Sequence, residues 1–352
     1  MGCNHVRLGS HSNLHVMDLN NDSNTSKEES QTDFSEDEAH IEAITKILYE
    51  NFYGCDMLLC LFITALQSYR VDRCLRPFPS TYIKDSNKDI DHLRSICENI
   101  PSLDKIFKAP QTCSKEIINF LVWLYCQKDQ PSLHRTNYSQ VEVPSPLKKS
   151  LQPHYVYEVI YPQKAEEIWQ KRKNSRSSFL AYHGSQLDNF YSILKVGLQH
   201  HLSIGKELLY GKGIYLTTEI LISMPYAPFG VTWSKSCLAD KISVIAVCEV
   251  IDDLDKVKCK DSNCKERAVN QDSLSGNIPE KYFVITDSDM IRLKYLFVYK
   301  ENTINFLESW IFKNIAVVLI CTYLFLLFCI GFFQGPTWPI VKRHLYKMLY
   351  SH

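Results

Sequence analysis

A run of 19 residues without a charged side chain, Ile315 to Phe333, constrains this chain more than any other part of its sequence. A helix needs about 20 apolar residues to cross the ~30 Å hydrocarbon core of a bilayer. The alternative is a buried helix of a soluble domain, but such helices rarely stay apolar on every side over this length. We therefore expect 315–333 to be a transmembrane helix, with Trp310 and Trp338 at the two interfaces.

The place of this run near the C-terminus predicts an orientation in the membrane. Only the 19 residues 334–352 follow it, so the ribosome would release the chain before the run is recognised, and no secretory signal precedes it. We expect a tail anchor, with the bulk of the chain in the cytosol and the short tail in the lumen. The flanking charges weakly favour the opposite orientation, because Lys342, Arg343 and Lys347 follow the run.

The rest of the chain divides by composition into four parts. Residues 1–40 are rich in Asn, Ser, Asp and Glu and should be disordered. Residues 41–128 predict a helical domain, in which the apolar run Asp56 to Leu66 is too short to span a membrane and is typical of a core helix. A proline-containing linker, 129–153, comes next. In 154–300 the pattern changes from helix to strand.

The residues after 153 form short runs that are rich in β-branched and aromatic side chains. The predicted strands are 155–161, 179–183, 213–216, 242–250, 282–285 and 293–299. Two predicted helices intervene, one at 189–196 that ends at Gly197 and a shorter one at 218–226. Because helices and strands do not alternate regularly, we expect an α+β fold with an N-terminal helical domain, a mixed-sheet catalytic domain and one C-terminal transmembrane helix.

Charge balance and missing motifs exclude several functions. Lys plus Arg and Asp plus Glu are 39 each, so no overall basic field attracts nucleic acid, and we expect no nucleic-acid partner. Neither G-x-G-x-x-G nor a Walker motif occurs. The 13 cysteines are scattered, which is typical of reduced thiols. Cys259 and Cys264 lack two further ligands at suitable spacing, so we expect no bound metal.

Two segments could together form a slot for a flat aromatic amide and its ribose. Tyr182-His183-Gly184-Ser185 ends one predicted strand, and Gly211-Lys212-Gly213-Ile214-Tyr215-Leu216 contains another. A glycine directly after the histidine lets a ligand approach the backbone, whose polar groups can bind a carboxamide. Taken alone, either the histidine or the tyrosine is more often part of a core. Their combination favours a binding site.

The pattern around these segments resembles the catalytic domain of the poly(ADP-ribose) polymerase family, the diphtheria-toxin-like ADP-ribosyltransferases. It consists of His-Gly-Ser at 183–185, a helix ending at Gly197, Gly-x-Gly-Ile-Tyr-Leu at 211–216, and then Ser223 and Tyr226. The similarity covers about residues 155–300. It implies that the substrate is NAD⁺ and that the reaction is transfer of ADP-ribose to protein.

Other parts of the chain resemble one branch of that family, the tail-anchored mono-ADP-ribosyltransferase of the endoplasmic reticulum. These parts are Leu66 to Tyr69, Leu75 to Pro79, Val247 to Asp252 and the C-terminal anchor. The resemblance implies a location in the membrane of the endoplasmic reticulum and nuclear envelope. It also implies protein substrates that include stress-sensor kinases of the endoplasmic reticulum and a nuclear import receptor.

The family's motifs imply a role for each of six residues in binding NAD⁺: His183, Gly184, Ser185, Tyr215, Ser223 and Tyr226. The Gly184 backbone and the Ser223 hydroxyl would hold the nicotinamide carboxamide. Tyr215 would line the pocket of the nicotinamide ring, and Tyr226 would stack on that ring.

The two sugars and the third catalytic position complete the implied site. His183 would bond the ribose on the adenosine side, and Ser185 the nicotinamide ribose. The polymerases have a glutamate where this chain has Tyr282, so the implied catalytic set is His183, Tyr215 and Tyr282. A phenol with a pKa near 10 is a poor general base, which predicts transfer of a single ADP-ribose. Glu280 is the rival for this position, although a glutamate after Pro279 is more often a solvated turn residue.

Two functions of different class follow from these residues. The first is an active, membrane-anchored mono-ADP-ribosyltransferase. The second is a scaffold that keeps the NAD⁺-binding fold and has little activity, as in some family members. The joint presence of His183, Tyr215, Ser223 and Tyr226 favours the enzyme.

Overall fold

A computed structural model describes residues 22–200, 209–260, 265–270, 273–301, 314–334 and 338. Our expectations for residues 1–21, Cys264, Trp310 and the basic residues of the tail lie outside these ranges. The chain divides into two compact units, Met1–Lys300 and Glu301–His352.

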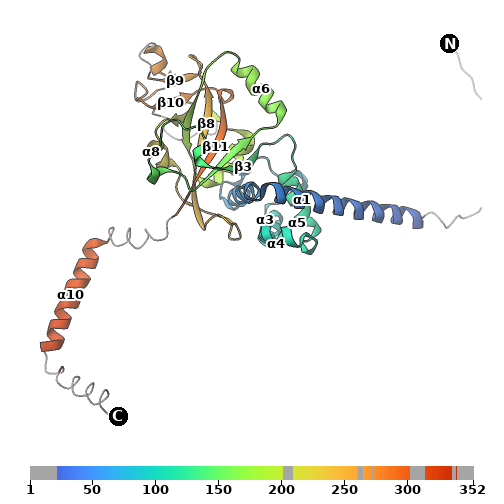
Figure 1. Ribbon diagram of the computed structural model, residues 1–352, viewed down its shortest axis with the longest axis horizontal. Helices are drawn as coiled ribbons and strands as arrows, with labels where there is room; N and C mark the ends of the chain where they lie inside the picture. The colour runs from blue at the N-terminus through green and yellow to red at the C-terminus, as the bar shows by residue number, and fades with distance from the viewer. Residues whose placement is uncertain are drawn as a thin grey trace, which may run out of the picture. The chain divides into compact units, whose positions relative to one another are not determined.

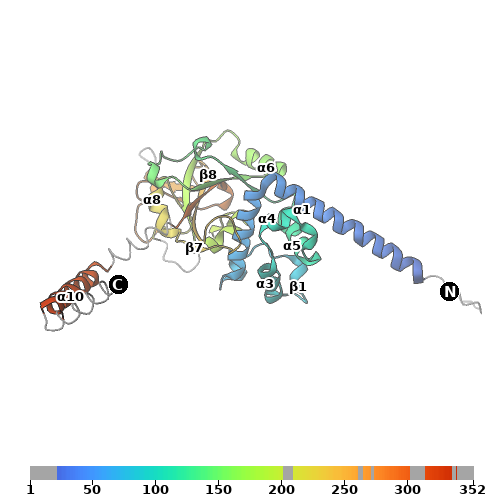
Figure 2. The same ribbon diagram turned by 60° about the horizontal axis from the view of Figure 1, so that its bottom comes forward.

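The first part of the larger unit is helical, as the apolar spacing predicts. Its helices are α1 (Asp22–Gln67), α2 (Val71–Cys74), α3 (Ile90–Asn99), α4 (Leu103–Lys108) and α5 (Lys115–Tyr125), with a small hairpin of β1 (Ile83–Lys84) and β2 (Asn87–Lys88) before α3. The backbone of α1 departs from helical geometry at Asn51, and Figure 2 shows the bend. The apolar run from Asp56 to Leu66 is a core helix, as predicted, because almost all of its side chains are buried.

The start of α1 differs from our expectation that residues 1–40 are disordered, because the helix begins at Asp22. Adding residues to an existing helix costs little compared with starting one, and the buried side chains of Ile44 and Leu48 stabilise this helix farther along. Two contacts to α5 hold the helix farther along. The carboxylate of Asp37 lies 3.0 Å from Lys115 Nζ, and His40 Nδ1 lies 2.9 Å from Asn119 Oδ1.

The second part of the larger unit is a sheet of nine strands in the order β3-β4-β11-β8-β5-β6-β10-β9, with β7 beside β8. The strands are β3 (Ser132–Thr136), β4 (Tyr155–Ile160), β5 (Ser178–Gly184), β6 (Ile214–Thr217), β7 (Gly230–Val231), β8 (Lys241–Ile251), β9 (Val257–Cys259), β10 (Tyr282–Ile285) and β11 (Ile291–Lys300). The helices α6 (Gln163–Lys173), α7 (Phe190–Val196) and α8 (Ile220–Ser223) connect them (Figure 1). The α+β class is confirmed, and α7 ends at Gly197 (φ +78°) as predicted.

Every pair of neighbouring strands in the described sheet is antiparallel, where we expected a mixed sheet. The direction of a strand depends on its partner, and the partners here are far apart in the chain. The central strand β8, for example, pairs with both β5 and β11 and is buried at all but its first residue. Alternation within one strand carries no information about such partners.

The segment 129–153, which we expected to be a linker, is part of the folded sheet. Its residues Ser132–Thr136 form β3 and pair with β4 at the edge of the sheet. Beyond β3 the segment covers one face of the sheet with apolar side chains spaced between its prolines. These side chains are Tyr138, Val141, Val143, Leu147 and Leu151. They pack against a core that contains Tyr182, Ile245 and Phe297.

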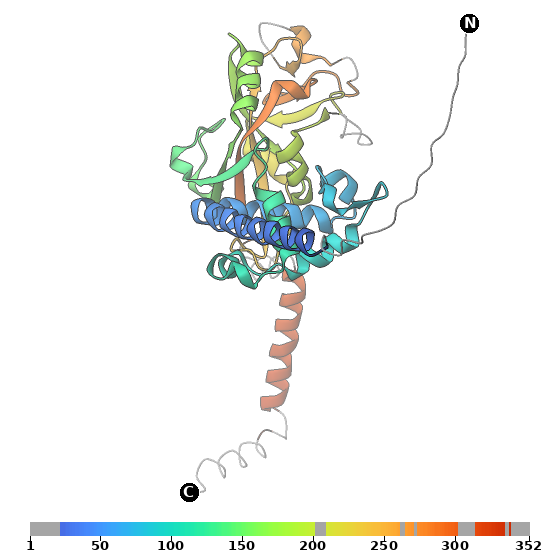
Figure 3. The same cartoon turned by 90° about the vertical axis from the view of Figure 1, so that its right-hand side faces the viewer.

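The other face of the sheet and the helices share one hydrophobic core. Phe62 of α1, Phe120 of α5 and Tyr191 of α7 meet there, with ring centroids 5.0 and 5.1 Å from Phe62. Figure 3 shows the helices gathered at one end of the sheet. Helix α1 also contacts β3 and α7 directly. The helical part and the sheet therefore form a single interior, where the sequence suggested two separate domains.

The smaller unit contains α10 (Ile315–Gln334), a helix of 20 residues with no charged side chain. Among the described residues, the stretch that is long and apolar enough to cross a membrane is Glu36–Gln67 of α1. Within its most apolar 18 residues, 61% are buried in the protein. In α10 the apolar stretch with described side chains is Leu319–Phe328. Membrane crossing by 315–333 thus stays a prediction.

Lys195 of α7 provides a test of this interior by pH. The side chain is 9% exposed, and burial lowers its pKa to about 8. In the unfolded chain the Lys195 ammonium keeps its proton up to about pH 10.4. Between pH 8 and 10.4 the unfolded chain therefore binds more protons than the folded protein, and the unfolding free energy rises with pH. We expect Lys195→Met to raise the unfolding free energy by about 3 kcal/mol at pH 7 and by little at pH 10.4. Urea unfolding of both proteins at the two pH values measures this difference, and a gap that does not change with pH would contradict it.

Candidate active site

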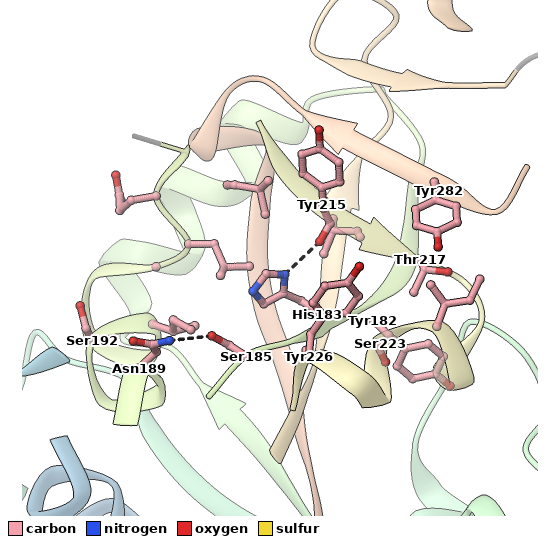
Figure 4. A pocket seen from close by; sticks show the side chains of 18 of the residues that line it. Tyr182, His183, Ser185, Asn189, Ser192, Tyr215, Thr217, Ser223, Tyr226 and Tyr282 are labelled. Atoms are coloured by element: carbon pink, nitrogen blue, oxygen red, sulfur yellow. Dashed lines mark hydrogen bonds between the residues drawn. The ribbon is translucent and has the colours of Figure 1, made fainter. Parts of the chain in front are cut away.

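A cavity of about 420 Å³ opens where the ends of β5, β6 and β10 meet α7 and α8 (Figure 4). All the residues that we predicted from sequence for the site line it: His183, Gly184, Ser185, Tyr215, Ser223, Tyr226 and Tyr282. They come from segments up to 99 residues apart, from position 183 to position 282. The fold therefore brings together the residues that the motifs single out, and it does so at one hollow.

His183 is oriented by the neighbouring strand. Its Nδ1 lies 3.0 Å from the backbone oxygen of Tyr215, and because a carbonyl can only accept, Nδ1 carries the proton and donates (Figure 4). This bond fixes the ring between β5 and β6. It also assigns Nε2 as the nitrogen that can contact a ligand in the cavity.

Gly184 allows a close approach between the end of β5 and α8. A Cβ atom added at Gly184 would lie 2.1 Å from the backbone oxygen of Ser223 and 3.1 Å from Cβ of Tyr226. Only a glycine leaves room for this contact. The side chain of Ser223 is buried and its Oγ donates to the Ile220 carbonyl at 2.8 Å, whereas Tyr226 is 61% exposed. A side chain at position 184 would therefore displace both Ser223 and Tyr226.

Tyr210 packs beside two tyrosines that line the cavity, Tyr215 and Tyr282. The ring of Tyr210 lies 6.4 Å from that of Tyr215 and 6.2 Å from that of Tyr282, measured between centroids. The Tyr215 hydroxyl donates to the Gly211 carbonyl at 2.8 Å and accepts from the Tyr210 N–H at 3.0 Å. Tyr215 lines the cavity, while its hydroxyl stabilises the turn before β6.

Tyr282 reaches the cavity from β10. The register of the sheet pairs it with Thr217 of β6, itself a lining residue. Burial, together with the nearby phenols of Tyr226 and Tyr210, raises the pKa of Tyr282 above its ordinary value. Its hydroxyl is therefore protonated at neutral pH and can donate a hydrogen bond, but it cannot act as a base.

Glu280, the alternative residue for the third catalytic position, is exposed. It lies two residues before Tyr282, in the turn that leads into β10. Its neighbour Lys281 has φ +69° and pairs with Glu219 at 2.8 Å. The structure therefore brings Tyr282 to the cavity wall and leaves Glu280 in solvent.

Several lining residues were not found from the sequence. They are Arg70, Arg73, Asn189, Ser192, Ile193, Gln199 and Thr217. Asn189 donates to Ser185 Oγ at 2.9 Å, and its spacing of four residues from that serine could have indicated it. Arg70 and Arg73 come from the helical part, more than 100 residues before the motifs. No local pattern predicts such a contact.

Comparison with known proteins agrees with this geometry. The family model of the poly(ADP-ribose) polymerase catalytic domain matches residues 146–301, and that of the ARTD15 N-terminal domain matches 46–125. The chain is 34% identical over 308 residues to "Protein mono-ADP-ribosyltransferase PARP16" from Homo sapiens, a match that covers 82% of this chain and 94% of that protein. The chain belongs to the poly(ADP-ribose) polymerase family. The Mus musculus protein of the same name is 32% identical with the same coverage.

A more distant relative shows how far the similarity extends. "Protein mono-ADP-ribosyltransferase PARP8" from Mus musculus is 24% identical over 317 residues, which cover 75% of this chain but 34% of that protein. Membership of the poly(ADP-ribose) polymerase family makes this chain an ADP-ribosyltransferase enzyme whose catalytic domain uses NAD⁺ as its substrate. Among the described residues, no group of three or more His, Cys, Asp or Glu side chains could hold a metal ion.

Proposed function

We propose that this enzyme transfers a single ADP-ribose from NAD⁺ to side chains of proteins, itself included. The observation that carries the proposal is Tyr282, a neutral phenol, at the cavity wall where chain growth would need a base. A growing polymer requires a sugar hydroxyl to be deprotonated as it attacks. An ionised carboxylate or an amine of a protein needs less help. The relatives named mono-ADP-ribosyltransferases also support transfer of a single ADP-ribose.

Binding of the nicotinamide end follows from the contacts around Gly184. We infer that the Gly184 backbone and the Ser223 hydroxyl bond the carboxamide, since both stand at the point where β5 and α8 touch. The nicotinamide ring would lie between Tyr215 and Tyr226, whose rings line the same cavity. A ring held flat between two aromatic faces is a geometry that aromatic pairs favour.

The chemical step follows from the polar groups near the sugars. His183 Nε2 would bond the ribose on the adenosine side, and Ser185 Oγ the nicotinamide ribose. The bond between C1′ and the nicotinamide nitrogen breaks, and its electron pair leaves with neutral nicotinamide. The protein nucleophile then bonds to the oxocarbenium-like C1′. Tyr282 would donate to the ribose, so the residues mainly position and stabilise the reactants.

The product of the wild-type enzyme and two substitutions test this proposal. Full-length protein incubated with tagged NAD⁺ should acquire single ADP-ribose groups by mass spectrometry. Tyr282→Ala should lower labelling about tenfold, the value of one lost hydrogen bond in the transition state, whereas Glu280→Gln should stay within about twofold. Polymer ladders would overturn single transfer. A wild-type protein that binds NAD⁺ but never labels would favour the alternative, a membrane-anchored scaffold.

We further propose that α10 crosses a membrane as a tail anchor, with the catalytic unit in the cytosol and the short tail in the lumen of the endoplasmic reticulum and nuclear envelope. The support is its 20-residue length without a charge, which matches the hydrocarbon thickness of a bilayer. Protein lacking 315–333 should be released from membranes by alkaline carbonate, while the full chain stays. Release of both would overturn the anchor.

Proteins that face the cytosol, whether or not they are membrane proteins, are the substrates that such an anchor brings within reach. We propose that they include stress-sensor kinases of the endoplasmic reticulum, which would connect the enzyme to the unfolded protein response, and a nuclear import receptor. Modification of these proteins by the wild-type enzyme and not by a His183→Ala variant, in membranes given tagged NAD⁺, would support the assignment. Equal labelling with both enzymes would contradict it.

A further inference from the structure

The cavity has a positive end that the catalytic motifs do not explain. Of the described residues that line it, Arg70 and Arg73 carry a positive charge, and none of these lining residues is an aspartate or glutamate. Both arginines belong to the helical part: Arg70 directly precedes α2, and Arg73 lies within it. The sheet supplies His183 and the lining tyrosines other than Tyr226, which follows α8, and the helical part supplies the cations.

Arg70 is fixed in place beside the predicted ribose contact. Its Nη2 donates to the two carboxylate oxygens of Asp188 at 3.1 and 3.0 Å and also to the Gln186 side chain. Ser68 Oγ donates to the same carboxylate at 2.6 Å. Gln186 is the residue after Ser185, so this network holds the guanidinium at the end of the cavity where the nicotinamide ribose would be bound.

Asp188 largely offsets the charge of Arg70, which makes Arg73 the main source of positive potential at this end. The Arg73 side chain is exposed, and within the described part of the chain its guanidinium has no carboxylate in ion-pair distance. Arg70 retains one unmet donor, because its buried Nε has no hydrogen-bond acceptor. Two guanidinium groups with donors to spare suit a ligand with several anionic oxygens.

We propose that Arg73, supported by Arg70, binds the diphosphate of NAD⁺, so that the helical part completes the substrate site. The inference rests on the proposed function. The diphosphate is joined to the 5′ carbon of the nicotinamide ribose, and Ser185, which would contact that ribose, lies next to the residue that Arg70 bonds. Arg73 is a positioning residue, because it holds a part of the substrate that does not react. The contact between Arg73 and the diphosphate should lower the KM for NAD⁺ and leave kcat unchanged.

Two ligands separate this role from a general effect on the fold. ADP-ribose carries the diphosphate, whereas benzamide is a neutral analogue of nicotinamide alone. In full-length protein in detergent, Arg73→Ala should raise the Kd of ADP-ribose and the KM of NAD⁺ about tenfold, with the Kd of benzamide unchanged. Arg73→Lys should recover part of the loss. Raising NaCl from 50 to 500 mM should weaken ADP-ribose binding more in the wild type than in Arg73→Ala.

Arg76→Ala is the matched control. Arg76 lies three residues farther along, its Nε donates to the Asp72 carbonyl at 2.9 Å, and it does not line the cavity. Its loss should leave both Kd values unchanged. Equal ADP-ribose affinity in Arg73→Ala and wild type would overturn the inference, as would equal loss of ADP-ribose and benzamide. A raised KM for the acceptor protein alone would assign Arg73 to an acidic acceptor instead. Failure of wild type to bind ADP-ribose would count against the proposed function itself.

Discussion

His183→Ala should reduce labelling of the protein by tagged NAD⁺ by about 100-fold or more, the effect of removing one positioned donor from a site that stabilises developing charge. The substitution removes the Nε2 contact to the ribose. It also removes the Nδ1–H donor that the Tyr215 backbone oxygen accepts at 3.0 Å, so the ends of β5 and β6 lose a link. Initial labelling rates of the full-length protein at saturating NAD⁺ measure the effect.

His183→Asn separates the chemical role from the structural one. The asparagine Nδ2 stands where the imidazole Nδ1 stood and can still donate to the Tyr215 carbonyl, but asparagine has no group at the position of Nε2. We expect its melting temperature to match that of the wild type within a few degrees while labelling stays as low as in His183→Ala. Near-normal labelling by His183→Asn would mean that the histidine only joins the two strands.

Gly184→Ala should be as damaging as loss of the histidine, although it adds only one methyl group. The new Cβ would stand 2.1 Å from the Ser223 backbone oxygen, so α8 has to move by about an ångström to restore a normal contact. Such a movement displaces Ser223 and Tyr226, and a misplacement of this size typically costs about 100-fold in rate. We expect labelling to fall by about that factor and benzamide binding to be lost, since both proposed nicotinamide contacts shift together.

Gly276→Ala provides the control for adding a methyl group to a glycine. A Cβ at Gly276 would have no heavy atom within 4 Å, so the change costs only the strain of its φ of +79°. We expect labelling within about twofold of the wild type. If Gly184→Ala labels as well as Gly276→Ala, the close approach of β5 and α8 has no part in catalysis.

The local features of the fold were predictable because they depend on neighbouring residues. Gly197 ends α7 with a positive φ, as the sequence indicated, and Ser114 caps α5 by accepting from the Ile117 N–H. The partners of strands were not predictable in this way. Their pairing is decided by contacts between distant segments, as for β5 with β8. The apolar residues of 129–153 were missed because prolines interrupt any regular period.

In the candidate site, too, residues within local motifs were predictable and residues from distant segments were not. His183, Gly184 and Tyr215 lie within short motifs, so they could be found from the sequence, and the structure places them around one cavity. Arg70 and Arg73 could not, because they reach that cavity through the packing of the helical part against the sheet. Charge alone did not distinguish them from the other basic residues of a neutral chain.

The interior that the helices share with the sheet restricts how this enzyme can be divided. A cut within 129–153 would expose the ring cluster around Phe62 on one piece and its partner Tyr191 on the other. Neither piece would keep enough apolar contact to stay folded by itself. Proteolysis in that segment would therefore inactivate the enzyme and would not leave a working catalytic fragment. Transplanting the sheet alone onto another protein would likewise yield an aggregating chain in place of a portable ADP-ribosyltransferase.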